Sequence, residues 1–218
     1  QGELDQIAYN IIEKYGATPA FLGHPKGSKH PFPATITASV NEELVHGIPG
    51  DRVLQDGDIV SLDCGTIYKG WVSDSAFTWP VGQVTEDVQK LLEVTESSLY
   101  KAIDQCMAGN RLGDVSSSVQ RYIEPLGYNV VRQYGGHGVG RKMWEEPHIP
   151  NWGDPGKGIK LRRGMVFAVE PMVMIGGPEV EVLDDHWTIV TADRQWCAHF
   201  EHTIAVTENG PDVLTKMD

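Results

Sequence analysis

An internal repeat is the feature that most constrains how this chain can fold. A helical stripe of apolar residues runs over positions 4–15 and closes at Gly16, and a matching stripe closes 111 positions later at Gly127. The paired positions are Leu4 with Val115, Ala8 with Val119, Ile12 with Ile123, and Glu13 with Glu124. We therefore expect one domain over 1–218, built from two related halves at about 1–80 and 85–210.

Each copy continues into a loop and a predicted strand. The two segments are residues 54–63 (LQDGDIVSLD) and residues 161–170 (LRRGMVFAVE). In this alignment Asp63 falls on Glu170. The repeat thus predicts two carboxylates at equivalent strand positions.

A longer helix is predicted between the copies. Thr85 is a suitable N-cap, apolar residues from 88 to 103 share one face, and Gly109 is the expected stop. Nothing equivalent precedes the first copy. We expect that a first helix was lost by truncation, processing or cleavage, or that the chain does without it. The face it would cover then exposes apolar surface unless another chain covers it.

The remaining pattern is typical of a mostly antiparallel sheet. Strands are predicted over 59–67, 71–79, 166–175, 187–191 and 199–207. Residues 68–70 (YKG) indicate a hairpin, and proline and glycine crowd the expected loops at 23–34 and 147–158. The predicted class is α+β, with two related halves around one sheet.

Charge and cysteine content narrow the function classes. Eighteen basic and 30 acidic residues give a net charge of -12, which repels phosphate backbones and favours basic partners or bound cations.

No apolar run approaches the roughly 20 residues of a membrane span. The 3 cysteines form no CxxC motif, so a reducing cytoplasm is the simplest location. The sequence begins Gln1-Gly2-Glu3, with no Met, no basic n-region and no apolar h-region, so no targeting segment is visible and we do not expect Gln1 to be the natural start.

Two aspartates flank the hairpin signal. If Tyr68 and Lys69 form a two-residue loop, Asp63 and Asp74 stand directly opposite each other, with Cβ atoms about 4.5–5.5 Å apart. The two carboxylates would repel each other, but a cation bound between them would attract both. A three-residue loop with a bulge at Gly70 would shift the pairing by one residue, and a single strand aspartate is more often solvated or capped.

Two glutamates lie in the later predicted strands. Glu170 follows the apolar run 164–169, where a buried carboxylate needs a partner, an arginine being the alternative to a metal. Strand alternation places Glu201 on the same face as His199, and an exposed strand face is the alternative there.

His137 stands among four glycines in residues 135–140 (GGHGVG). Glycines let a backbone approach a site closely, although a lone histidine is more often structural. Four carboxylates and one imidazole together suit a pair of divalent ions such as Mn, Fe, Co or Zn, which can activate a water for hydrolysis.

Five segments carry a resemblance to a known family. They are residues 39–49 (SVNEELVHGIP), 56–63 (DGDIVSLD), 136–140 (GHGVG), 164–172 (GMVFAVEPM) and 201–203 (EHT). These motifs resemble the type I methionine aminopeptidases of the pita-bread fold, in peptidase family M24, and the likeness covers nearly the whole chain. It implies two pseudo-twofold-related halves, and family members carry a helix before the segment that corresponds to Gly2.

The resemblance also implies a role for each metal ligand. Asp63 would chelate one ion, His137 and Glu170 the other, and Asp74 and Glu201 would bridge both. Glu170 would act as general base and later as proton donor, with a bridging water as nucleophile.

Substrate-side residues follow from the same resemblance. His46 corresponds to the histidine that contacts the scissile amide. Phe32, Thr37, Met143 and Trp187 align with positions lining the methionine pocket, although an insertion within 24–31 affects the first of these and Met143 could equally be core.

One position departs from the family pattern. Family members read histidine, glutamate, glutamate, proline where this chain has residues 144–147 (WEEP). An indole donates one hydrogen bond but neither accepts nor titrates. We expect Trp144, still a substrate-contacting residue, to leave metal binding intact while it weakens turnover or changes the preferred residue after methionine.

The predicted function is metal-dependent removal of the N-terminal methionine from peptides and nascent proteins. The expected protein is a cytoplasmic monomer, with the ribosome as a candidate partner and no contact with nucleic acid or membrane. The sequence leaves two alternatives open: a prolidase or aminopeptidase P that shares the fold, and a non-catalytic binding protein.

Overall fold

The computed structural model describes residues 1–216, and both helices of the repeat form as predicted. The helices are α1 (Gly2–Lys14), α2 (Glu86–Ile103) and α3 (Leu112–Ile123), which continues into the 3-10 turn η1 (Glu124–Leu126). The Thr85 side chain accepts a hydrogen bond from the backbone N–H of Val88, which confirms the predicted N-cap of α2. Gly127 ends the second copy in a left-handed conformation.

The predicted stop of α2 at Gly109 is wrong. The helix ends at Ile103 and its C-cap is Asp104. Beyond it, the chain turns so that the N–H of Gly109 donates to the carbonyl of Leu161. Directly after the helix, the N–H groups of Gln105 and Cys106 donate to the carbonyls of Ala102 and Ile103, so the chain leaves the helix in a tight turn before the glycine is reached.

Short strands make up most of the remaining chain. In order they are β1 (Thr18–Pro19), β2 (Thr37–Val40), β3 (Glu43–Val45), β4 (Ile59–Asp63), β5 (Thr66–Tyr68), β6 (Trp71–Ser73), β7 (Ser75–Pro80), β8 (Asn129–Val130), β9 (Gly135–Gly138), β10 (Glu145–Pro150), β11 (Val166–Val169), β12 (Met172–Met174), β13 (Val180–Val182), β14 (Ile189–Thr191), β15 (Cys197–His199), β16 (Glu201–Thr207) and β17 (Gly210–Val213).

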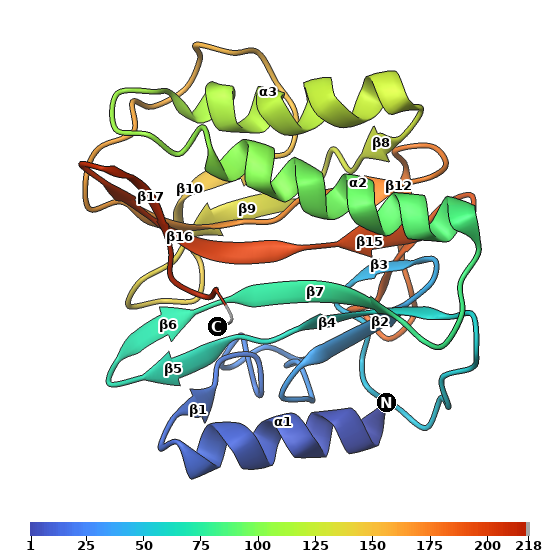
Figure 1. Cartoon of the computed structure of the whole chain (residues 1–218). Helices are drawn as coiled ribbons and strands as arrows, with labels where there is room; N and C mark the ends of the chain where they lie inside the picture. Colours follow the sequence, from blue (N-terminus) through green and yellow to red (C-terminus); the bar gives the residue numbers. More distant parts are fainter. Residues whose placement is uncertain (217–218) are drawn as a thin grey trace.

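The main sheet has eight strands, in the order β10-β9-β11-β16-β7-β4-β2, with β17 paired to β16. Three smaller sheets are β1-β5-β6, β15-β12-β8 and β13-β14-β3. Each strand pairing within the described residues is antiparallel, as predicted. In Figure 1, α2 and α3 lie side by side against the sheet, and α1 lies at the opposite edge of the molecule.

Four of the five predicted long strands are interrupted, and the fifth starts late. The segment 59–67 divides into β4 and β5, the segment 71–79 into β6 and β7, and the segment 166–175 into β11 and β12. The segment 199–207 likewise divides between β15 and β16, and the segment 187–191 forms a strand only from Ile189. At each division the chain passes between the main sheet and a smaller sheet, so the continuous strands of the prediction were wrong.

The register of the first hairpin also differs from the prediction. Tyr68 pairs with Trp71, which makes Lys69 and Gly70 the two-residue turn. Both turn residues have positive φ, 49° and 77°, as a type I′ turn requires. Asp63 consequently pairs with Ala76 and does not stand opposite Asp74.

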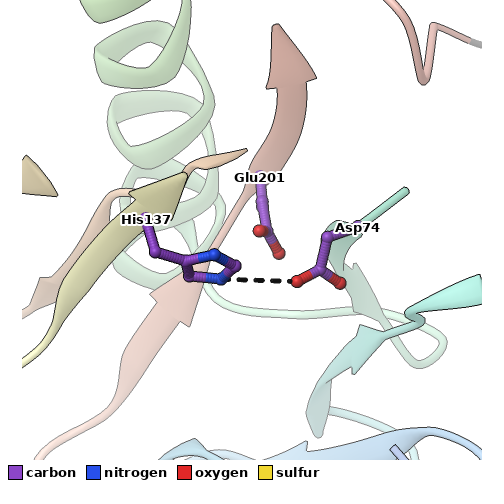
Figure 2. Close-up of side chains that lie close together, drawn as sticks. All are labelled: Asp74, His137 and Glu201. Carbon is purple, nitrogen blue, oxygen red and sulfur yellow. Dashed lines mark ion pairs between the residues drawn. The ribbon is translucent and has the colours of Figure 1, made fainter. Parts of the chain in front are cut away.

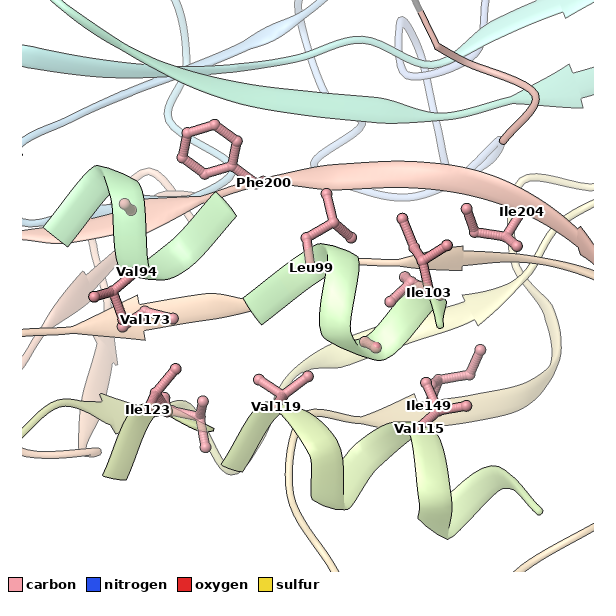
Figure 3. Packing of buried hydrophobic residues seen from close by; sticks show 14 of the residues in the cluster. Val94, Leu99, Ile103, Val115, Val119, Ile123, Ile149, Val173, Phe200 and Ile204 are labelled. Carbon is pink, nitrogen blue, oxygen red and sulfur yellow. The ribbon is translucent and has the colours of Figure 1, made fainter. Parts of the chain in front are cut away.

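The largest apolar core lies between the helices and the main sheet (Figure 3). Leu91 and Leu99 of α2, together with Val119 and Ile123 of α3, are buried against strand residues such as Phe167. This packing supports the curved sheet from one side and so fixes the positions of the residues on its other side. Within the described residues, the helices lack the length and apolar character needed to cross a membrane.

Candidate active site

The four predicted carboxylate ligands stand where the chain crosses between sheets. Asp63 ends β4, Asp74 separates β6 from β7, Glu170 directly follows β11, and Glu201 begins β16. His137 lies in β9, next to β11. The interruptions of the strands therefore bend ligands from both halves of the sequence toward one place.

Three of these side chains converge closely enough to hold a metal ion. Asp74, His137 and Glu201 each offer a ligand atom within 4.8 Å of the others, and Figure 2 shows them pointing toward one another. His137 Nε2 lies 3.6 Å from Asp74 Oδ2 and 3.7 Å from Glu170 Oε1. The described residues thus contain a compact set of oxygen and nitrogen donors.

Burial leaves the site short of hydrogen-bond partners. Asp63, Asp74 and Glu201 are 8%, 3% and 1% exposed. Within residues 1–216, one buried oxygen of each of these carboxylates has no partner: Asp63 Oδ1, Asp74 Oδ1 and Glu201 Oε1. Unpaired buried polar groups are costly, so these atoms fit a divalent cation that would coordinate them.

Electrostatics supports the same conclusion. Burial, followed by the repulsion of Asp74 and Glu170, raises the pKa of Asp63 well above its ordinary value. Burial and the neighbouring carboxylates likewise raise the pKa of Glu201. A cation among these groups would favour their ionised forms.

The imidazole of His137 is oriented by its own strand. Its Nδ1 lies 2.9 Å from the carbonyl oxygen of Gly138, which leaves Nε2 directed at the carboxylates. Burial lowers the pKa of His137, but Asp74 and Glu170 outweigh burial and raise it to about 9. A Cβ atom on Gly136 would overlap with the Ala168 carbonyl oxygen, which confirms that the glycine permits a close backbone approach.

A further histidine was not assigned to the site from the sequence. His199 is 1% exposed, and its Nε2 lies 3.6 Å from Glu170 Oε2 and 4.0 Å from Glu201 Oε2. Hydrogen bonds between Thr78 Oγ1 and the backbone N–H and carbonyl of His199 hold this position. The shared strand face of His199 and Glu201 was the available signal. The neighbours of Glu170 are therefore histidines, in place of the arginine considered from the sequence.

One cavity of about 550 Å³ brings all eleven predicted site residues together. They are Phe32, Thr37, His46, Asp63, Asp74, His137, Met143, Trp144, Glu170, Trp187 and Glu201. The cavity is also lined by residues that the sequence did not single out, among them Phe21, His24 and His148.

One wall of the cavity is apolar. Phe21, Phe32 and Met143 are buried and belong to one packed cluster. The ring of Phe32 lies edge-on to Trp187, with centroids 5.2 Å apart. An unbranched apolar side chain fits such a wall.

His46 also lines the cavity. It follows β3 with a φ of 61°, and its ring centroid lies 6.1 Å from that of Trp187. Burial is the main cause that lowers the pKa of His46 to about 4, so the imidazole is neutral at pH 7. A neutral imidazole can both donate and accept a hydrogen bond.

Comparison with known proteins defines the class. A family model described as metallopeptidase family M24 matches residues 2–208. Because this match spans nearly the whole chain, the chain belongs to metallopeptidase family M24.

The close relatives are methionine aminopeptidases. Methionine aminopeptidase 1 of Bacillus subtilis is 53% identical over 215 residues, which cover 99% of this chain and 85% of that protein. The crystal structure of methionine aminopeptidase from Thermotoga maritima matches with a TM-score of 0.95 at 46% identity, covering 99% of this chain and 85% of that one. The fold is thus the pita-bread fold, and the chain falls among the methionine aminopeptidases.

The alternatives are less well supported. The prolidase of Pyrococcus horikoshii shares the fold, with a TM-score of 0.66 and 25% identity over 84% of this chain and 48% of that one. Both values are lower than for the methionine aminopeptidases, so a prolidase is not favoured. Because these relatives are named as enzymes, a non-catalytic binding protein is not favoured either.

Proposed function

We propose that this chain hydrolyses the peptide bond that follows an N-terminal methionine, using two divalent metal ions. The observation that carries the proposal is the convergence of Asp74, His137 and Glu201 in a cavity whose other wall is apolar. Such a cavity can hold an apolar side chain and place the bond beside it near the carboxylates.

We assign the ligands to the two ions as the family resemblance implies. Asp63 would hold one ion, His137 and Glu170 the other, and Asp74 and Glu201 both. The ions would be Mn, Fe, Co or Zn, which accept mixed carboxylate and imidazole ligands. When bound, divalent ions lower the pKa of a water and polarise a carbonyl.

The protein's own groups would carry the proton transfers. In this proposal Glu170 accepts a proton from the attacking water and returns it to the leaving amine. Neutral His46 would hydrogen-bond the scissile amide, since burial keeps the imidazole unprotonated at pH 7. His199, packed against Glu170 and Glu201, would restrict the movement of both carboxylates.

The apolar wall would select methionine. Phe32, Met143 and Trp187 present rings and a thioether to the cavity, with Thr37 beside them. Thioether and aromatic groups pack favourably against each other, and an unbranched side chain adapts to an irregular pocket. The free amine of the substrate would lie toward the carboxylates, which restricts cleavage to the first residue.

A paired assay tests the proposal. The protein, purified anaerobically and analysed for metal content, would be incubated with Met-Ala-Ser, Gly-Pro and Arg-Pro-Pro. We expect bound divalent metal and release of methionine from the first peptide alone, with loss of both in Asp74→Asn and retention in the surface variant Glu208→Gln. Well under one ion per chain, together with no cleavage after addition of Co or Mn, would contradict the proposal.

Partners and location extend the same proposal. Peptide or nascent protein N-termini would be the substrates, with the ribosome as a candidate partner, in the cytoplasm. The three cysteines are free in the described structure, which suits a reducing compartment. The net charge of -12 supports the expectation of no direct nucleic-acid contact.

A further inference from the structure

Two aromatic residues at the mouth of the cavity have polar atoms that no contact within the protein uses. His24 and Trp144 both line the cavity, and their rings meet edge-on with centroids 4.5 Å apart. Within residues 1–216, neither the His24 ring nitrogens nor Trp144 Nε1 makes a hydrogen bond. These groups are free to bind a substrate.

The backbone holds His24 firmly against the apolar wall. Its carbonyl accepts a hydrogen bond of 2.7 Å from the N–H of Phe32, and its N–H donates to the carbonyl of Phe21 at 2.9 Å. The N–H of Gly23 donates to the carbonyl of Phe32 at 2.8 Å. Residues 25–31 thus form an exposed loop whose base fixes His24 beside the pocket.

The position of Trp144 indicates where a peptide would leave the site. Its ring centroid lies 6.3 Å from that of His137, and the residue is 45% exposed. Phe32 and Met143, in the apolar wall, are only 3% and 6% exposed. A chain with its first side chain against that wall can therefore run outward past Trp144 and His24, which both line the cavity.

We propose that His24 is a substrate-binding residue that hydrogen-bonds the amide linking the second and third residues of the peptide. An extended peptide carries backbone donors and acceptors that need partners, and a neutral imidazole supplies one of each. Trp144 positions the imidazole by packing against its ring. The inference rests on the proposed function and adds a contact beyond the methionine pocket.

Kinetics on two substrates tests this role. Met-Ala-Ser contains the amide in question, whereas Met-Ala does not. We expect His24→Ala to raise KM for Met-Ala-Ser by about 3- to 10-fold, the value of one neutral hydrogen bond, with kcat changed less than about twofold. KM for Met-Ala should change little.

Two further variants separate the possible causes. His24→Phe keeps a ring against Trp144 but has no polar atom, so it should resemble His24→Ala. His30→Ala removes a histidine from the same loop that does not line the cavity, and its backbone contact with Trp187 Nε1 survives the change. That variant should behave as the unmodified protein. Metal content and thermal unfolding of each variant would report any loss of folding.

The outcomes are distinct. Wild-type KM in His24→Phe, an equal loss in His30→Ala, or equal effects on both peptides would overturn the role of His24 and leave the proposed function standing. If the unmodified protein cleaves neither peptide, the proposed function fails, and the role of His24 fails with it.

Discussion

At the residue scale, Trp144 is the site residue that departs from the family pattern, which has a histidine at this position. The indole lies at the mouth of the cavity, near the ring of His137 and edge-on to His24. It can donate one hydrogen bond but cannot accept one or carry a proton at neutral pH. Trp144 can therefore stabilise a developing negative charge only through the single N–H of its indole, and not with a positive charge of its own.

Replacing Trp144 with histidine should increase activity. We expect Trp144→His to raise kcat/KM on Met-Ala or Met-Gly peptides, by up to about 10²-fold, because one orienting contact is often worth that much. Trp79→His is a matched control, since Trp79 is similarly exposed and does not line the cavity. An unchanged rate in Trp144→His, measured with metal content held equal, would argue against this role.

At the element scale, the interruptions of the strands create the site. Asp63, Asp74, Glu170 and Glu201 each lie where the chain passes between the main sheet and a smaller one. In uninterrupted strands, successive side chains would point to alternate faces of one sheet, and nothing would bend the chain at these four positions. The close approach of β9 to its neighbours completes the arrangement, because it places His137 against the same bends.

A substitution in β9 tests how closely the strands must approach. A Cβ atom on Gly136 would overlap with the Ala168 carbonyl, so Gly136→Ala should lower the free energy of unfolding by about 1–3 kcal/mol. Gly50→Ala is the control, because the nearest atom to its Cβ is 3.9 Å away. Urea unfolding measures both variants. Equal free energies of unfolding for Gly136→Ala and Gly50→Ala would show that β9 accommodates the added methyl group without loss of stability.

At the scale of the whole molecule, stability should depend on metal and pH together. The pKa values of Asp63, Glu201 and His137 are raised, so the folded state retains protons that the unfolded state releases. Such groups stabilise the metal-free fold at lower pH, and this contribution is lost as pH rises. For His137 it is fully present below its ordinary value of 6.5 and disappears as pH passes about 9. The lowered pKa of His46 has the opposite effect: it destabilises the folded state, and only as pH falls below 6.5.

Thermal unfolding with and without chelator measures this dependence. We expect the metal-free protein to lose stability between pH 7 and pH 9, while a divalent ion at about 100 times its Kd restores about 2.7 kcal/mol. The gap between the two forms should widen with pH, since ligands bind metal in their deprotonated forms. A gap that narrows as pH rises would count against a metal centre built on these residues.

Much of the fold and site could be predicted because the relevant signals are local. The cap at Thr85 and the left-handed Gly127 depend on a few neighbouring residues, and glycine around His137 reflects backbone contact at that point. The metal-ligand candidates were identified by the repeat and by short motifs, and the structure brings them to one cavity.

Only the tertiary structure decided how distant segments meet. The Lys69–Gly70 turn set the register that pairs Asp63 with Ala76, and the segment after α2 is bound to Leu161, more than 50 residues further along the chain. His24 and His199 joined the site through packing between segments far apart in the chain. Sequence periodicity shows which face of an element is buried, but register and convergence depend on the balance of contacts across the whole molecule.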